Sequence, residues 1–137
     1  MTVDVLALNE EVLGFSNIWY ESALRHAFRI TLPGGQSMRV ITAPFFLGTK
    51  MEAFRGRGNM DFQASHDLED LVAVIEGRDT LLREIAESPL ELRRYLAEAA
   101  KMLLAEPRFL DVLPGFVLDD ERVPLIQERL AELARQG

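Results

Sequence analysis

The sequence predicts an α+β fold in a single domain, with a sheet-forming part in residues 1–42 and a helical part in residues 43–137. Apolar and polar residues alternate with period two on both sides of a Pro-Gly-Gly turn, which is the pattern of a β-hairpin. From residue 43 onward, apolar residues recur with the 3.6-residue period of amphipathic helices. The chain has 137 residues, of which 48% are hydrophobic, so one domain can bury a core without disulfides.

The N-terminal residues predict a first strand. Residues 2–8 are apolar and partly β-branched apart from Asp4, which favours a buried strand, and residues 9–14 suggest a cap and a short helix. Asp4 either meets a cation or lies at an exposed strand end, because an unpaired buried carboxylate is costly. A strand that is apolar on both faces needs neighbours and cover on both faces. We therefore expect this chain to lack an N-terminal segment of its domain.

A second short helix and a hairpin are expected next. Trp19, Ala23 and Ala27 stand four residues apart, which fits a short helix. Residues 28–32 and 37–41 then alternate as two strands, and glycine in the connecting turn supplies the positive φ that the turn needs. Together with the first strand, this hairpin would form a small mixed sheet.

The helical part is predicted to form a bundle of about five helices. Pro44 suits the first turn of a helix that should end at Gly56. Ser65 is a good N-cap for the second helix, which Gly77 should end. The remaining helix starts are predicted at Asp79, Pro89 and Asp119, with a short helical turn between Pro107 and Pro114.

Composition excludes several classes of protein. The chain contains no cysteine, which rules out Cys-ligated zinc and iron–sulfur clusters. No apolar run approaches the roughly 20 residues that cross a bilayer, so we expect a cytoplasmic protein without a membrane partner.

The net charge of −7 is unevenly distributed. Residues 22–60 hold six basic residues and one acidic residue, whereas the rest of the chain holds nine basic and 21 acidic residues. The overall acidity argues against a general nucleic-acid binder, whose domain is usually basic. It leaves open a local anion site in residues 22–60, as well as a solvated basic face with no partner.

Candidate functional residues are concentrated between residues 50 and 70. The residues concerned are Lys50, Arg55, Arg57, His66, Asp67 and Asp70. Lys50 and Arg57 are seven residues apart, on one face of a regular helix, and Asp67 and Asp70 can point at one target from the next helix. A glycine-rich loop between the two helices permits close approach of a ligand.

A cation that faces two carboxylates over such a loop suits a polyphosphate held with a metal ion. The same spacing suits a network of salt bridges between the helices, together with acids that stabilise a helix start. Spacing alone leaves both interpretations open.

Several segments carry a resemblance. They are T-V-D-V, E-E-V-L-G-F-S-N-I-W-Y, L-P-G-G, I-T-A-P-F-F-L-G-T-K-M-E-A-F-R-G-R-G and S-H-D-L-E-D-L-V-A-V-I-E-G-R, in this order. Together they resemble the C-terminal part of the nucleotidyltransferase-like family related to the AbiEii/AbiGii toxins, from residue 2 to about residue 80 and more loosely beyond. The resemblance implies part of a fold similar to DNA polymerase β. It also implies binding of a nucleoside triphosphate with Mg²⁺ and transfer of a nucleotide, in some toxins to the end of a tRNA.

The resemblance also implies roles for individual residues. Asp4 matches a carboxylate that binds Mg²⁺ for catalysis, Lys50 matches the basic residue near the triphosphate, and Asp67 belongs to the later acidic motif. Lys50 and Asp67 would therefore be catalytic together with Asp4. The nucleotide-binding residues implied are Lys50, Arg55, Arg57, His66 and Asp70.

The sequence departs from the family pattern because it contains no Asp-x-Asp, the motif that supplies two metal ligands. We therefore expect a truncated or degenerate nucleotidyltransferase-like protein. Its intact form would transfer a nucleotide to an RNA or protein hydroxyl and could have an antitoxin as partner. The alternatives are a non-catalytic binding module on the same scaffold and an unrelated α+β domain with surface salt bridges. An unpaired edge of the first strand also predicts a homodimer or larger oligomer.

Overall fold

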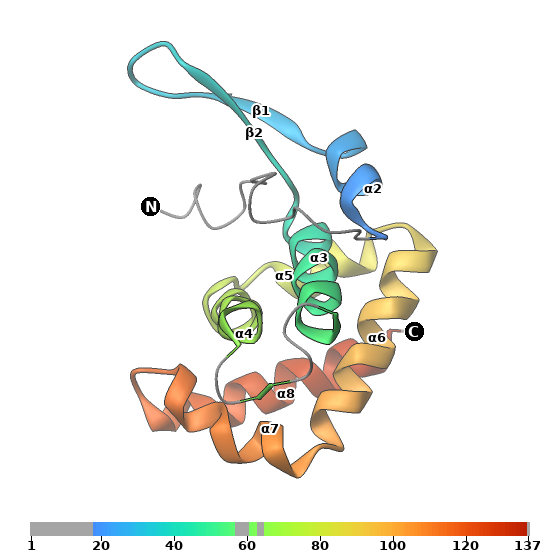
Figure 1. The fold of residues 1–137 in the computed structure, drawn as a ribbon, viewed down its shortest axis with the longest axis vertical. Helices are drawn as coiled ribbons and strands as arrows, with labels where there is room; N and C mark the ends of the chain where they lie inside the picture. The colour runs from blue at the N-terminus through green and yellow to red at the C-terminus, as the bar shows by residue number, and fades with distance from the viewer. Residues whose placement is uncertain (1–17, 57–60, 63–64, 137) are drawn as a thin grey trace.

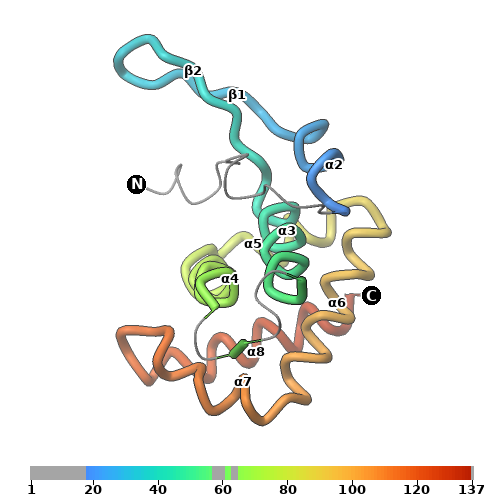
Figure 2. The backbone as a smooth tube through the Cα atoms, viewed as in Figure 1, coloured from blue at the N-terminus to red at the C-terminus, as the bar shows by residue number. Residues whose placement is uncertain are grey.

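The computed structural model describes residues 18–56, 61–62 and 65–136, and it confirms the α+β fold. A two-stranded antiparallel sheet precedes a bundle of helices (Figure 1). The hairpin projects from one end of the helical body, with helix α2 (Tyr20–Arg25) at its base (Figures 1 and 2). The predicted strand in residues 2–8 and the helix in residues 9–14 lie outside the described residues. The mixed sheet and the oligomer that were inferred from that strand therefore stay predictions.

The hairpin joins strands β1 (Phe28–Thr31) and β2 (Ser37–Val40), in which Phe28 pairs with Val40 and Thr31 with Ser37. Its turn is closed by a backbone hydrogen bond of 2.7 Å from Leu32 to Gln36. Gly35 has φ of +84°, a conformation that side chains with a Cβ atom rarely adopt. The Pro-Gly-Gly sequence therefore forms the turn that the alternation predicted.

Helix α3 (Ala43–Arg55) lies at the centre of the body, and ten of its 13 residues are buried. It packs against α4 (His66–Gly77), α5 (Leu81–Ala86) and α6 (Leu90–Leu104), while α8 (Val123–Ala134) packs against α4 and α6. The chain between α6 and α8 forms α7 (Pro107–Val112) and two 3₁₀ turns, Leu113–Phe116 and Asp120–Arg122. Contact on several sides explains why α3 is so apolar.

The described helix starts match most of the predicted ones. The Ser65 side chain accepts a hydrogen bond of 3.1 Å from the Leu68 N–H, as an N-cap does. Pro89 precedes α6, and Asp119 caps the 3₁₀ turn that leads into α8. The prediction for Asp79 was wrong: Thr80 stands at the N-cap of α5, and the carboxylate of Asp79 binds Arg129 instead.

Aromatic packing in the core connects the start of α2 to the helical body. The ring of Trp19 makes edge contacts with Phe45 of α3 and Tyr95 of α6, with centroid separations of 6.5 Å and 5.2 Å.

Within residues 18–56, 61–62 and 65–136, no helix is both long enough and apolar enough to pass through a lipid bilayer.

Candidate functional site

Lys50 of α3 faces the start of α4. Its ammonium nitrogen lies 2.8 Å from Oδ2 of Asp70 and 3.5 Å from Oδ1 of Asp67. It also lies 5.5 Å from the ring centroid of Phe46, one turn earlier in α3. The structure therefore brings three of the candidate residues together, and they join the two helices that flank the glycine-rich loop.

The two carboxylates differ in their exposure to solvent. The side chain of Asp67 is 9% exposed and that of Lys50 is 15% exposed, whereas that of Asp70 is 44% exposed. A buried carboxylate needs a cation or hydrogen bonds, and both Lys50 and the N-terminal end of the α4 dipole meet this need at Asp67. Asp70 is more exposed, so solvent screens its pair with Lys50, although this pair is the closer of the two.

Arg55 contacts a different neighbour. Its guanidinium carbon lies 5.9 Å from the ring centroid of Tyr95 on α6, and the Tyr95 hydroxyl donates a hydrogen bond of 2.6 Å to Glu52. Burial, together with this hydrogen bond, raises the pKa of Tyr95. Arg55 follows Lys50 by five residues, about 140° around a helix, so the two cations belong to different faces of α3.

The remaining candidates are not brought to Lys50 by the described structure. The side chain of His66 is 93% exposed, and its nearest ionic partner is Glu69, at 3.6 Å. Arg57 and Asp4 lie outside the described residues. The described residues contain no group of three or more His, Asp or Glu side chains arranged to hold a metal ion. Of the predicted site, the structure therefore supports contact among Lys50, Asp67 and Asp70.

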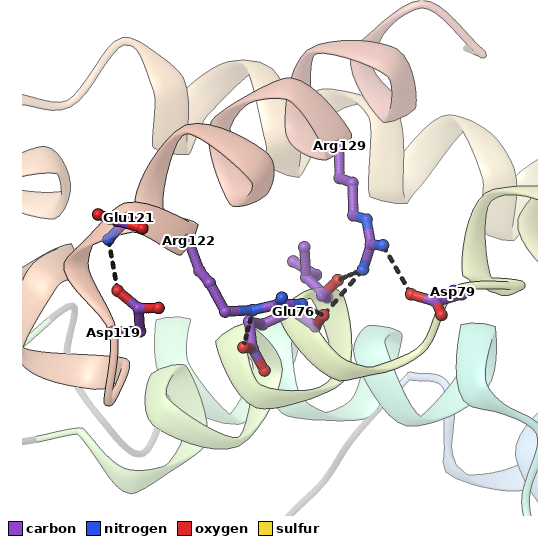
Figure 3. A network of polar contacts seen from close by, with 7 residues as sticks. Glu76, Asp79, Asp119, Glu121, Arg122 and Arg129 are labelled. Carbon is purple, nitrogen blue, oxygen red and sulfur yellow. Dashed lines mark hydrogen bonds and ion pairs between the residues drawn. The ribbon is translucent and has the colours of Figure 1, made fainter.

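A polar network that the sequence did not indicate holds the C-terminal end of α4 (Figure 3). Arg129 of α8 donates to the carbonyl oxygens of Ile75 and Glu76 at 2.7 Å and 2.9 Å, and to Asp79 at 2.8 Å. Arg122 pairs with the Glu76 carboxylate and donates to its carbonyl oxygen at 3.2 Å. These arginines satisfy carbonyl groups that a helix end leaves without partners, so the network is structural.

The structure also contains a shallow pocket that the sequence did not indicate. It has a volume of about 260 Å³ and lies where α2 ends and α3 begins, beside the turn from α5 to α6. His26 and Phe45 line one side and stack with 4.8 Å between their ring centroids, while Glu84 and Ser88 line another. These residues come from separate segments with no shared motif, so no sequence signal could have indicated the pocket.

Comparisons with known proteins do not identify the chain: no family model, no curated protein and no solved structure matches it. The arrangement of its own residues is therefore the basis of any functional proposal.

Proposed function

We propose that this chain is a nucleotidyltransferase-like protein in which Lys50 binds the phosphates of a nucleoside triphosphate. The observation that supports this proposal is the position of the Lys50 ammonium, which is largely shielded from solvent at the junction of α3 and α4 and held by Asp67 and Asp70. A shielded cation interacts more strongly with an incoming phosphate than an exposed one does, because the surroundings screen it less.

In this proposal the two carboxylates have different tasks. Asp67 is buried and stays paired, which fixes the ammonium in position. Asp70 is the more exposed partner, and a phosphate oxygen replaces it when the nucleotide binds. The exchange needs no movement of α3 or α4, because only the Asp70 side chain has to turn toward solvent.

Transfer of the nucleotide is the further part of the proposal. The cofactor would be Mg²⁺, with Asp4 as the ligand that the resemblance implies, and it would supply positive charge to offset that of the phosphates. The acceptor would be a hydroxyl group of an RNA or a protein, as in a toxin–antitoxin system. Because the sequence contains no Asp-x-Asp, we expect this chain alone to bind nucleotide without transferring it. A binding module without catalysis on the same scaffold is the alternative.

Equilibrium binding of a fluorescent ATP analogue in the presence of Mg²⁺ tests the Lys50 site. Lys50→Ala should weaken binding at least tenfold, which corresponds to about 1.4 kcal/mol. Asp70→Asn should tighten binding, because it removes the group that competes with phosphate for Lys50. Lys101→Ala is a matched control, since Lys101 pairs with Glu98 on the exposed face of α6.

The salt-bridge interpretation gives the opposite pattern. If Lys50 only joins α3 to α4, Lys50→Ala lowers the melting temperature and leaves nucleotide binding at the parent's level. The proposal is also wrong if the parent chain binds no nucleotide at all. Labelled triphosphates with Mg²⁺ and total RNA then test transfer, and labelling of RNA by the isolated chain would contradict the expectation of binding alone.

A further inference from the structure

The two faces of the projecting hairpin differ in chemistry. Ile30, Met38 and Val40 lie on the inner face and pack against the core. Arg29 and Thr31 of β1 and their partners Arg39 and Ser37 of β2 lie on the outer face, and all four are exposed. We call these four residues the outer face of the hairpin. It carries two guanidinium groups and two hydroxyl groups, and it has no acidic or apolar side chain.

Arg29 and Arg39 are directly opposite each other in the register. The Cβ atoms of such a pair lie about 5 Å apart, and like charges at this distance destabilise a hairpin. Arg39 relieves part of this repulsion by donating a hydrogen bond of 2.8 Å to the Leu24 carbonyl oxygen, at the end of α2. The Leu24 carbonyl precedes Arg25, a further exposed cation in the last turn of α2.

These three arginines lack acidic partners in the described part of the chain. Arg29 and Arg25 donate to the hydroxyl groups of Ser37 and Ser22, at 3.4 Å and 3.0 Å, and neither they nor Arg39 form an ion pair there. In the helical body, Arg78, Arg122 and Arg129 are each paired with a carboxylate, whereas Arg93 donates to the carbonyl oxygen of Ala86.

We propose that the outer face of the hairpin, together with Arg25, binds the sugar–phosphate backbone of a nucleic acid. Guanidinium groups bind phosphate oxygens through two parallel hydrogen bonds, and serine and threonine hydroxyls are common additional donors to phosphate. A phosphate between Arg29 and Arg39 would remove the repulsion across the strands. A protein partner would be expected to meet some apolar surface, and the four residues of this face offer none, while the 49% exposed Phe28 of β1 lies on the opposite face.

The acidity of the remaining chain limits the strength of this interaction. Binding is expected to be independent of base sequence and to depend strongly on salt. Three neutralised phosphates would weaken the affinity roughly 20- to 40-fold between 50 mM and 200 mM salt. The Lys50 site takes no part, so this inference holds or fails independently of the proposed nucleotide binding.

Fluorescence anisotropy with the full chain and a labelled single-stranded RNA of about 20 nucleotides tests the inference at low salt. Arg29→Glu should weaken binding at least tenfold. The same change places opposite charges across the strands, so the melting temperature should stay the same or rise. Arg94→Glu, on the exposed side of α6, makes the same change in net charge and should leave binding within about twofold of the parent. Lys50→Ala should also retain RNA binding.

Several outcomes would overturn the inference. One is an Arg29→Glu variant that binds RNA like the parent, and another is an Arg94→Glu variant that loses as much affinity as Arg29→Glu. Affinity that does not change between 50 mM and 200 mM salt would also contradict it. Finally, poly-glutamate that competes with RNA at equal concentration of charge would show that the face takes acidic proteins instead.

Discussion

Arg129 of α8 donates a hydrogen bond of 2.7 Å to the carbonyl oxygen of Ile75, which lies 54 residues earlier in the last turn of α4 (Figure 3). The same guanidinium group binds the next carbonyl oxygen, that of Glu76, and the side chain of Asp79. A cation is favourable at this position because the C-terminal end of a helix carries partial negative charge. Arg129 thus joins the end of one helix to the side of another.

Replacement of Arg129 by alanine should lower the free energy of unfolding by about 1–3 kcal/mol. The reason is that the carbonyl groups of Ile75 and Glu76 lose a donor in a partly buried place, where the Arg129 side chain is 16% exposed. Urea denaturation measures the change.

Asp79→Ala is the matched control for Arg129. Asp79 is 85% exposed, so its ion pair should contribute less than about 1 kcal/mol. Equal losses in the two variants would mean that the ion pair, and not the carbonyl groups, accounts for the contribution of Arg129. Arg129→Lys should recover only part of the loss, because one ammonium group cannot reproduce the forked donor geometry.

Gly48 of α3 should not tolerate alanine. A Cβ atom at this position would lie 2.9 Å from Cδ1 of Leu92 and 3.2 Å from Cδ1 of Trp19. Leu92 and Trp19 would have to shift to relieve these contacts, and both are buried, so Gly48→Ala should cost about 1–3 kcal/mol even though alanine favours helices. Thermal or chemical denaturation can measure this cost.

Gly77, the last residue of α4, provides the contrast. A Cβ atom there would have no neighbour within 4 Å, and φ is not positive. Gly77→Ala should therefore leave stability unchanged or raise it by up to about 1 kcal/mol. A stable Gly48→Ala variant would show that α2 and α6 can move away from α3 at little cost.

The Arg78–Glu84 pair should make stability depend on pH in the acid range. Two hydrogen bonds, of 2.6 Å and 2.8 Å, join the guanidinium group to the carboxylate, and they lower the pKa of Glu84. A carboxylate whose pKa is lower in the folded state stabilises that state fully above its unfolded pKa of about 4.3. The contribution is lost as pH falls through the lower, folded value.

Urea denaturation of the parent and of Glu84→Gln at several pH values tests this pH dependence of stability. The difference in unfolding free energy should be at most about 1 kcal/mol at pH 7, because the pair is partly exposed, and it should shrink below about pH 4. Glu98→Gln, on the exposed side of α6, should have a small effect throughout. A difference for Glu84→Gln that grows toward acid pH would contradict the assignment.

Tyr95 should keep its proton to unusually high pH. Burial disfavours the tyrosinate, and the negative charge of Glu52 next to the hydroxyl raises the pKa further. In an absorbance titration of the folded chain, one tyrosine should ionise above the ordinary value of about 10, and Tyr95→Phe should remove that component. Stability linked to this group is present below about pH 10 and declines as pH rises further. Ionisation of both tyrosines near pH 10 would show that Tyr95 is accessible to solvent.

Local signals in the sequence were sufficient for most of the described secondary structure. The hairpin depends on a turn that Gly35 can close, and α4 begins where the Ser65 side chain binds the Leu68 N–H. These interactions join residues that are at most a few positions apart, so the local sequence contains both partners. The spacing of apolar residues likewise indicated the core faces of α4 and α6, because each element has a fixed period, whereas α3 is buried on most sides.

The candidate site was predictable only in part. Sequence spacing could place Asp67 and Asp70 near one target, but it could not decide whether Lys50 or Arg55 would meet them. Lys50 meets the two carboxylates because α4 packs against the side of α3 that carries Lys50, whereas Arg55 contacts Tyr95 of α6. The side of a helix that meets each neighbour depends on how all the helices pack, which no single segment specifies.

The α+β class, the hairpin and the approximate ends of the described helices follow from turn residues, caps and periodicity within each segment. Which charged groups meet depends instead on how the helices pack. Asp79 was expected to cap its own helix, yet it binds Arg129, 50 residues later, and Thr80 occupies the cap. The Asp79 carboxylate could accept hydrogen bonds from the start of α5 or from Arg129. Because α8 packs against the end of α4, the guanidinium group of Arg129 lies within hydrogen-bond distance of Asp79. Asp79 therefore had two possible partners, the nearby start of α5 and the distant Arg129. The sequence around Asp79 shows the first one alone, because the second comes close only when the chain folds.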